Sequence, residues 1–280
     1  MLHLHLQEPP AFVLGTNEIA SAVAVYLHKA GWPVILSHDP HPPVIRRGMA
    51  FHDCLFGDSM VVEGVVGESA ETSRQIADIL TRPDRVAVTA LHLTDLLAAV
   101  SPHVLVDARM QKHSVTPSLR HVARITVGLG PNFLVGVNCD IAVETRPARS
   151  GTLVTLGATD KADGIAGELG GYGAERFVYA QRSGRWHTAV DIGVRVFKGF
   201  VLGHLAGEPI EAPLDGQLRG IVRDGALVPQ GVKLLEIDPR GRKARWTGID
   251  DRGRVIAEAT LRAIKFRMAH GNAVTTQSSF

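Results

Sequence analysis

The sequence predicts an α/β domain with a mostly parallel sheet, followed by a mainly-β domain. Short β-branched runs alternate with segments of helical periodicity up to about residue 140, a pattern typical of βαβ units. Between residues 142 and 238 the helical periodicity disappears, and turn dipeptides that contain glycine become dense. A short motif also occurs twice in this second half, which indicates a small closed β structure.

The elements of the first half follow one another in a regular order. A strand is expected over residues 11–14, then Gly15, then a helix over 18–29 whose apolar residues recur at helical spacing. Further strands are expected over residues 34–37, 86–89, 104–107 and 125–128, and further helices over 68–80 and 93–100. This order predicts a Rossmann-like domain over residues 1–140.

The second half is expected to form a domain over residues 141–270. It ends in an amphipathic helix over 254–266, and residues 271–280 are expected to be a flexible tail. The motif G-x-x-V-x-x-G-x-x-L begins at Gly193 and again at Gly225, 32 residues later. Strands duplicated in this way predict two interlocked hairpin units in one small sandwich.

The duplicated motif resembles the barrel-sandwich hybrid of lipoyl and biotinyl carrier domains. In those carriers a lysine in the hairpin between the halves holds the prosthetic group. The corresponding hairpin here, residues 207–209, reads Gly-Glu-Pro and has no lysine. The resemblance therefore implies the scaffold without a covalent lipoyl or biotin.

Composition narrows the function classes. A net charge of +2 over 280 residues gives no electrostatic argument for a nucleic-acid or membrane partner. No apolar run approaches the ~20 residues that a spanning helix needs. The two cysteines, Cys54 and Cys139, do not make a disulfide framework, which favours a cytoplasmic location.

The turn after the first strand is where a dinucleotide fingerprint would lie. Gly15 and Ala20 fit the pattern G-x-G-x-x-G/A, but Asn17 replaces the middle glycine. Asp39, 24 residues after Gly15, stands near the position of a ribose-binding carboxylate. The alternative interpretation is an empty βαβ unit in which Asn17 is the helix N-cap.

Five more residues are candidates for a site that binds an anionic ligand. Arg46 and Arg47 follow a proline-rich loop and could grip a phosphate. Asp107 and Arg109 end a strand, and Gly130 follows another, where α/β sheets bind ligands. The alternatives are a solvated arginine pair and a local ion pair that closes the loop.

No catalytic or metal-binding residues are assigned. Cys139 lacks an adjacent base, and His38, Asp39 and His41 lack further ligands at a recognisable spacing. No Ser/His/Asp order, P-loop or HExxH pattern occurs in the sequence. Catalysis is therefore left open, with a non-catalytic role favoured.

Taken in order along the chain, several segments resemble the selenium-dependent molybdenum hydroxylase accessory proteins. They lie at residues 15–24, 44–51, 106–112, 128–131, 143–145, 170–176, 215–220, 231–233 and 237–240. The chain departs from the family at Thr16–Glu18, where a glycine-rich turn is usual, and after Thr145.

This resemblance implies an accessory protein for maturation of a molybdenum-cofactor hydroxylase. The protein would hold a phosphate-bearing cofactor, such as a molybdopterin or a nucleotide, or dock on the apo-enzyme or its assembly factors. Gly15, Asn17, Asp39, Arg46, Arg47, Asp107, Arg109 and Gly130 would contact the cofactor. The alternatives are a non-catalytic structural subunit or scaffold and an NAD(P)-dependent oxidoreductase, and formation of a homo-oligomer stays open.

Overall fold

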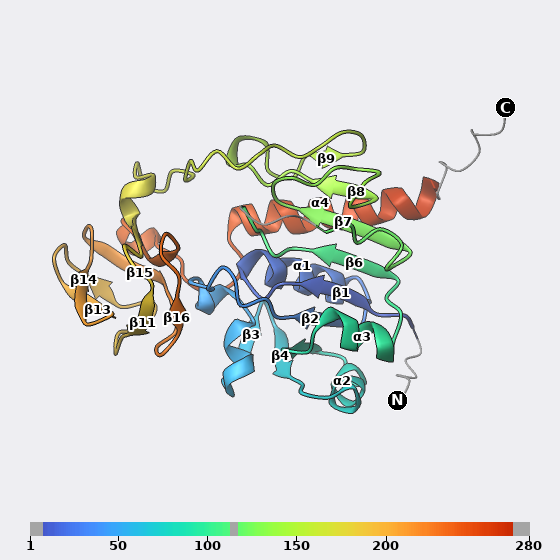
Figure 1. Ribbon diagram of the computed structural model, residues 1–280, viewed down its shortest axis with the longest axis horizontal. Coiled ribbons are helices and arrows are strands. Elements are labelled where there is room, and N and C mark those ends of the chain that lie inside the picture. The colour runs from blue at the N-terminus through green and yellow to red at the C-terminus, as the bar shows by residue number, and fades with distance from the viewer. Residues whose placement is uncertain (1–7, 113–116, 271–280) are drawn as a thin grey trace.

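The computed structural model describes residues 8–112 and 117–270, which form a large main sheet and a smaller β unit beside it (Figure 1). The expected tail over 271–280 lies outside the described residues. The main sheet has nine strands in the order β3-β4-β5-β2-β1-β6-β7-β8-β9. These strands are β1 (Ala11–Leu14), β2 (Val34–Ser37), β3 (Met60–Val62), β4 (Val65–Ser69), β5 (Arg85–Thr89), β6 (Val104–Asp107), β7 (Ile125–Leu129), β8 (Ile141–Val143) and β9 (Leu153–Val154).

The centre of the main sheet is parallel and its two edges are antiparallel. The strands from β4 to β8 pair in parallel, with Phe12 of β1 opposite both Ile35 and Leu105. At the edges, β3 pairs antiparallel with β4, and β9 with β8. Every residue of β1, β2, β6 and β7 is buried because helices cover both faces of the sheet.

Four helices provide that cover (Figure 1). They are α1 (Glu18–Lys29), α2 (Ser73–Leu80), α3 (Leu93–Ala99) and α4 (Asp251–His270). On one face, Val13 of β1 packs in a cluster with Ile19 of α1 and Ile256 of α4. On the other face, Phe12 shares a cluster with Ile76 of α2 and Leu96 of α3.

The β unit, residues 177–238, consists of two four-stranded antiparallel sheets. One has the order β10-β17-β15-β12 and the other β14-β13-β11-β16. The strands are β10 (Phe177–Tyr179), β11 (Gly184–His187), β12 (Arg195–Val196), β13 (Val201–Leu205), β14 (Glu208–Glu211), β15 (Gly216–Ile221), β16 (Leu227–Val228) and β17 (Lys233–Asp238). The fully buried Trp186 lies in their common core, and its indole Nε1 donates to the carbonyl of Val222 at 3.0 Å.

The repeated motif contributes strands to both sheets of the β unit. The copy that begins at Gly193 supplies β12 to one sheet and β13 to the other. The copy that begins at Gly225 supplies β16 and β17 in the opposite arrangement. Val196 and Val228 of the two copies meet in one hydrophobic cluster.

The fold class expected from the sequence is corrected by this arrangement. In place of a Rossmann-like domain joined to a lipoyl- or biotinyl-like barrel-sandwich hybrid, the chain has a nine-stranded mixed sheet and two antiparallel sheets. The antiparallel edges arise from hairpins whose turns the sequence analysis did not recognise. The turn between β3 and β4 places Glu63 and Gly64 at positive φ.

The C-terminal helix also packs elsewhere than expected. It was expected within the β domain, whereas α4 packs along α1 and against β7 and β8 of the main sheet. The chain thus leaves the main sheet after β9, builds the β unit, and returns to the main sheet. Within the described residues, no helix is both long and apolar enough to cross a membrane.

Candidate anion-binding site

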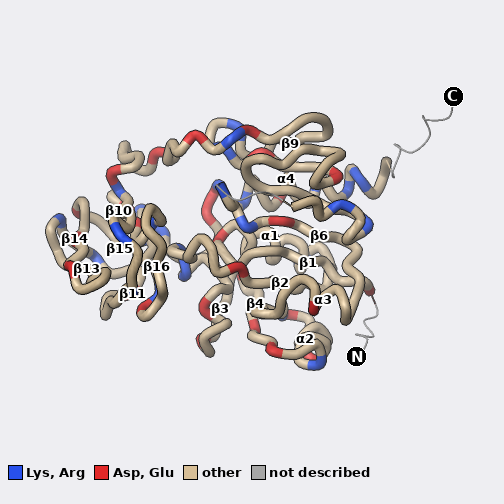
Figure 2. The backbone as a smooth tube through the Cα atoms, in the orientation of Figure 1, with Lys and Arg blue, Asp and Glu red and all other residues tan. Residues whose placement is uncertain are grey.

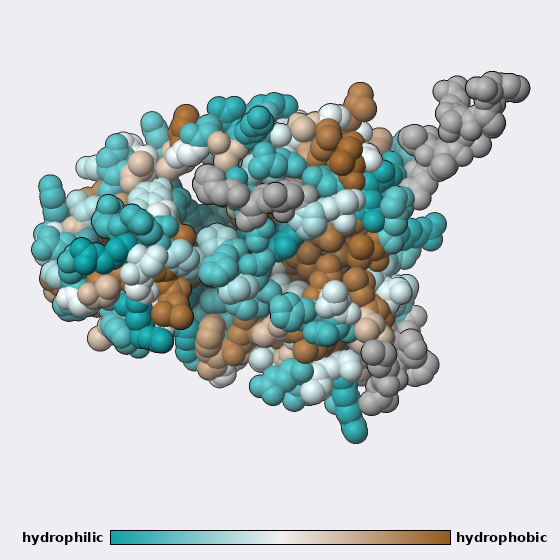
Figure 3. All heavy atoms as spheres, in the orientation of Figure 1, coloured by the Kyte–Doolittle hydropathy of each residue, from teal (hydrophilic) through white to brown (hydrophobic). Residues whose placement is uncertain are grey.

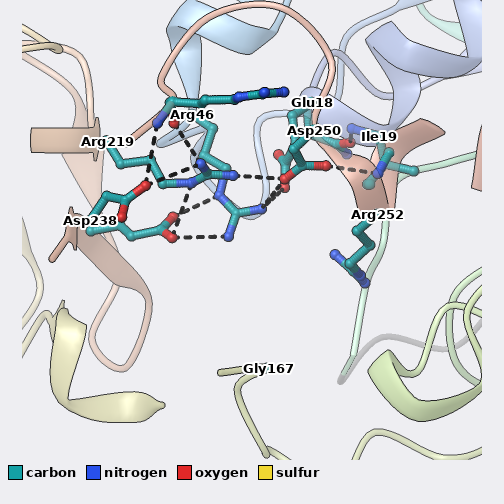
Figure 4. A network of polar contacts seen from close by, with 12 residues as sticks. Glu18, Ile19, Arg46, Gly167, Arg219, Asp238, Asp250 and Arg252 are labelled. Carbon is teal, nitrogen blue, oxygen red and sulfur yellow. Dashed lines mark hydrogen bonds and ion pairs between the residues drawn. The ribbon is translucent and has the colours of Figure 1, made fainter. Parts of the chain in front are cut away.

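The carboxyl ends of the central strands face the β unit (Figure 1), and an ion-pair network joins the two (Figure 4). Its centre is Glu236 of β17, which is fully buried. This carboxylate accepts hydrogen bonds from Arg46 Nε at 2.6 Å and from Arg176 Nη1. The guanidinium of Arg219 lies 3.3 Å from the same carboxylate. Three cations therefore share one buried anion.

Arg46 connects the β unit to the main sheet. Its Nη1 donates to Glu18 at the start of α1 at 2.9 Å, while its Nε holds Glu236. Asp250, just before α4, accepts from Arg219 Nη2 at 2.7 Å. Burial opposes the charge of Arg46, but Glu236 and Glu18 outweigh it and raise the pKa of that guanidinium. Charged residues of both signs gather where the two parts meet (Figure 2).

Arg47 makes a second internal connection. It pairs with Asp53 through Nη1 and donates from Nε to the carbonyl of Ile221 at 2.9 Å. Both expected phosphate-binding arginines are therefore engaged within the protein and hold the β unit against the main sheet. A direct contact of Arg46 or Arg47 with a ligand stays a prediction.

The turn after β1 is filled by the protein itself. Asn17 Oδ1 accepts from the backbone N–H groups of Ile19 and Ala20, both at 3.0 Å, and its Nδ2 donates to the carbonyl of Ala108 at 2.8 Å. A Cβ added at Gly15, which has φ +106°, would lie 3.1 Å from the same carbonyl oxygen. Asn17 is thus the N-cap of α1, and it occupies the amides that a pyrophosphate would need.

The other expected residues lie together at the edge of the sheet. Asp107 accepts from Arg109 Nε at 2.9 Å and from its Nη2 at 2.6 Å, which raises the pKa of Arg109. Arg109 also lies 3.7 Å from Asp39, which in turn accepts from Gln111 at 2.8 Å. A Cβ added at Gly130 would lie 3.4 Å from the Met110 sulfur.

A small cavity lies beside this group of residues. Its volume is about 10 Å³, and its lining includes Asp107, Arg109 and Phe133. A space of this size holds about one water molecule and no larger ligand. A ligand that uses Asp39, Asp107, Arg109 or Gly130 would therefore bind over this edge, and these contacts stay a prediction.

Two cations beside the network have no carboxylate partner of their own. The side chain of Lys233, at the start of β17, makes no hydrogen bond or ion pair with another described residue, and its Nζ lies 3.6 Å from the centre of the Phe177 ring. Burial, Arg46 and Lys112 together lower the pKa of Lys233 to about 8. The positive charge of Lys112, on the loop after β6, is therefore near enough to lower this pKa, while Glu236 and Glu18 act in the opposite direction.

Arg252 of α4 is the second such cation. It donates from Nη2 to the carbonyl of Thr145 at 3.0 Å, while its Nε is buried without a hydrogen-bond partner. Burial and the nearby Arg46 lower the pKa of Arg252 despite Glu18 and Asp250. Its side chain points away from the ion-pair network in Figure 4. On the face shown in Figure 3, the surface is hollowed between the β unit and the main sheet.

The sequence analysis missed Lys233 and Arg252 as site residues. They lie far apart in the sequence, and neither stands in a motif with a known ligand-binding role. Only the packing of β17 and α4 against the edge of the main sheet brings them close to Glu18 and Arg46.

The described residues contain no group of three or more histidine, cysteine or carboxylate side chains placed to hold a metal ion. Both cysteines are buried, and burial raises the pKa of Cys54 to about 11 and of Cys139 to about 12.

Thr16 contacts Nδ1 of His38 and of His52, at 3.2 and 3.0 Å. Burial lowers the pKa of His52 to about 3, so this ring is neutral at ordinary pH.

Comparison with known sequences gives one informative match, and no protein-family model matches the chain. Over 266 residues the chain is 32% identical to a protein of Escherichia coli (strain K12) named uncharacterized protein YqeB. The match covers 95% of the chain and 49% of that protein, so the chain spans about half the length of this relative.

Comparison with solved structures gives only distant likenesses. The product-bound ectoine utilization protein EutE (DoeB) of Ruegeria pomeroyi is 14% identical, with a TM-score of 0.24 over 83% of this chain and 85% of that one. An aspartoacylase family protein of Mesorhizobium loti is 12% identical, with a TM-score of 0.26 over 84% and 87% of the two chains. At these TM-scores the likeness carries no argument about fold or function.

The function implied by the sequence resemblance is corrected by these findings. No family model matches the chain, and the relative YqeB has no printed link to molybdenum hydroxylases, so nothing found supports that resemblance. A role in molybdenum-enzyme maturation, with the partners that it implied, is therefore dropped. The scaffold and oxidoreductase alternatives are dropped as well, since nothing matched supports them and Asn17 fills the expected pyrophosphate site.

Proposed function

We propose that this protein binds a small anion with two or more negative charges, in the hollow between the carboxyl edge of the main sheet and the β unit. The observation that carries this proposal is Lys233, whose half-buried ammonium lies 3.6 Å from the centre of the Phe177 ring and has no carboxylate bonded to it, near the cations Arg46 and Lys112. Glu236 and Glu18 offset part of the repulsion between these cations, and a bound anion would offset more of it.

The geometry assigns roles to the groups around the hollow. In this proposal Lys233 and Lys112 contact the anion, and Arg252, which like Lys233 lies near Arg46 and Glu18, adds positive charge to the site. Arg46 and Glu236 fix the wall from which Lys233 projects, because both are held by short ion pairs. A carboxylate or a phosphate would satisfy these donors equally well.

The expected edge residues extend this proposed site. Asp107 and Arg109, where the loop that leads to Lys112 begins, are joined by hydrogen bonds, and Arg109 lies 3.7 Å from Asp39, which follows β2. Arg109 is a fork of donors that a bound anion could share with Asp107. We keep Arg109 as a proposed contact of the anion, and Asp39, Asp107 and Gly130 as proposed contacts of the rest of the ligand.

We also propose how the chain divides into units. Residues 177–238 form the second unit, because they have a hydrophobic cluster of their own. The other described residues form the first unit, because α4 packs on the main sheet. The cytoplasm is the proposed location, as two buried free thiols fit a reducing compartment.

Titration calorimetry of the full chain with inorganic pyrophosphate and with citrate tests the proposal. We expect saturable binding that weakens at least about tenfold in Lys233→Met, since one charge-assisted contact is lost. Lys265→Met, on the exposed side of α4, is the matched control and should bind as the wild type does. The proposal would be overturned if neither anion gave a saturable binding isotherm, or if Lys233→Met and Lys265→Met bound the anions with equal affinity.

A further inference from the structure

A second cavity lies on the helical face of the main sheet, apart from the hollow. It is an open pocket bordered by the C-terminal end of α1, the turn between β3 and β4, and the segment from Ile249 to Leu261 of α4. Its volume is about 320 Å³. Pockets for small ligands begin at about this size, so it can take a compact molecule. No residue of the proposed anion site lines this cavity.

The inner wall of the cavity is apolar. Ile249 is buried against the main hydrophobic cluster, and Leu261 and the ring of Tyr26 are half-buried beside it. A branched or aromatic side chain placed on these three residues would remove apolar surface from water on both partners. Burial of this kind stabilises binding by about 25 cal/mol per Å² of apolar area.

The rim of the cavity carries charges that are only loosely paired. Arg254 Nη2 lies 3.7 Å from Glu63, and its Nη1 lies 3.4 Å from the Tyr26 hydroxyl. Glu63 accepts one further hydrogen bond, from Ile249 N at 3.5 Å. Lys29 has no ion pair with any residue that the structure describes. All these distances are longer than the 2.6 to 2.9 Å found around Arg46.

Loose pairing leaves donors and acceptors for a ligand. The rim has two cations, Lys29 and Arg254, and one carboxylate, Glu63, around a single apolar wall. A molecule that fits this set carries one carboxylate, one ammonium and one apolar side chain. We propose that the cavity binds a free α-amino acid with a branched or aromatic side chain.

The assigned contacts follow from these charges. The ligand carboxylate binds between Lys29 and Arg254, and its ammonium binds Glu63. The side chain lies on Ile249 and Leu261. Because the site binds both charged ends, analogues that lack either end leave a charged group without its partner and bind less tightly.

Calorimetry of the full chain with L-leucine tests this assignment. The two matched probes are 4-methylpentanoate, which lacks the ammonium, and 3-methylbutylamine, which lacks the carboxylate. We expect saturable binding of leucine, and binding of each analogue that is at least about tenfold weaker. Absence of saturation with leucine and with phenylalanine, or equal affinity for leucine and 4-methylpentanoate, would overturn the proposal.

Two variants place the binding in this cavity. Glu63→Gln keeps the acceptor for Ile249 N but removes the negative charge. It should therefore weaken the binding of leucine and leave the affinity for 4-methylpentanoate unchanged. Glu71→Gln, an exposed carboxylate outside the cavity, is the control. Lys29→Gln alters only the rim and should weaken the binding of leucine and of 4-methylpentanoate by about the same factor. Leucine binding that is unaffected by both rim variants would refute the assignment.

Discussion

Glu236 is the residue on which the charge balance between the two parts of the molecule depends. It is fully buried, and three guanidinium groups, those of Arg46, Arg176 and Arg219, surround it. Burial alone would raise the pKa of this carboxyl group, but the arginines outweigh burial and lower it. Glu236 therefore stays ionised and neutralises part of a buried positive cluster.

Replacing Glu236 by Gln removes that neutralising charge and leaves the guanidinium groups buried without it. We expect the free energy of unfolding, measured with urea, to fall by about 3–5 kcal/mol, the cost of breaking a buried ion pair from one side. Glu168→Gln, at an exposed position, should change it by less than about 0.5 kcal/mol. Equal stability of the two variants would show that Glu236 does not balance the cluster.

At the scale of single residues, the sequence predicts roles that depend on neighbours in the chain, but not roles that depend on residues far away in the sequence. Asn17 was weighed as a helix N-cap because an Asn directly before an apolar-periodic segment is a local signal, and the structure confirms that alternative. Lys233 and Arg252 gave no such signal. Their importance depends on which charges surround them, and those charges come from other parts of the chain.

Among the elements, β13 depends on a glycine at its centre. A Cβ added at Gly203 would lie 2.4 Å from the carbonyl oxygen of His187 and 2.5 Å from the ring of Trp186. Neither neighbour can move freely, because one is backbone and the other is a fully buried ring. The close approach of β13 to β11 therefore requires glycine at this position.

Gly203→Ala should therefore destabilise the β unit by about 1–3 kcal/mol, the usual cost of overpacking. Differential scanning calorimetry would detect this change as a lower Tm. The control is Gly167→Ala, since a Cβ there would meet Pro147 at an ordinary 3.5 Å. An equal Tm for Gly203→Ala and Gly167→Ala would contradict the close packing of β11 and β13.

The elements that the sequence predicted well have strong periodicity and clear ends. Helix α1 has the expected bounds of 18–29, and strands β1, β2 and β6 also match their expected ranges. The helix expected over 68–80 was wrong at its start, because β4 covers Val65–Ser69 and α2 begins at Ser73. Gly67 in β4 packs under Phe51, a contact that no local pattern indicates.

At the scale of the whole molecule, the path of the chain could not be predicted from the sequence. An amphipathic pattern predicts that one face of α4 is buried, but it does not say against which partner. Ile256 and Ile264 of α4 join the cluster of the main sheet. Asp250, which precedes α4, meets Arg219 of the β unit. The return of the chain closes the network around Glu236.

This network predicts how the whole molecule responds to acid. Glu236, Asp238 and Asp250 have lowered pKa values, because arginine contacts outweigh the effect of burial in each. A carboxylate with a lowered folded pKa contributes stability above its unfolded pKa of about 4, and loses it as the pH falls through the folded value. Urea unfolding should therefore show a steep loss of stability below about pH 4, after a gentler decline that begins near pH 6.5, where His52 takes up a proton in the unfolded chain but stays neutral in the folded one.

Glu236→Gln should show a shallower loss over the same range, because one of the contributing carboxylates is gone. Wild-type protein with the same free energy of unfolding at pH 3 as at pH 7 would contradict this account of the network.

The claim at the centre of this account is that Lys233 faces other cations across a hollow that an anion fills. Nuclear magnetic resonance of the full chain, with the lysine side chains labelled with ¹³C and Lys233 assigned from Lys233→Met, measures its pKa directly. We predict a value near 8 in the free protein, and a rise when citrate or pyrophosphate is added, because a nearby anion favours the ammonium. A pKa near the ordinary value of about 10.4, unchanged by either anion, would contradict it.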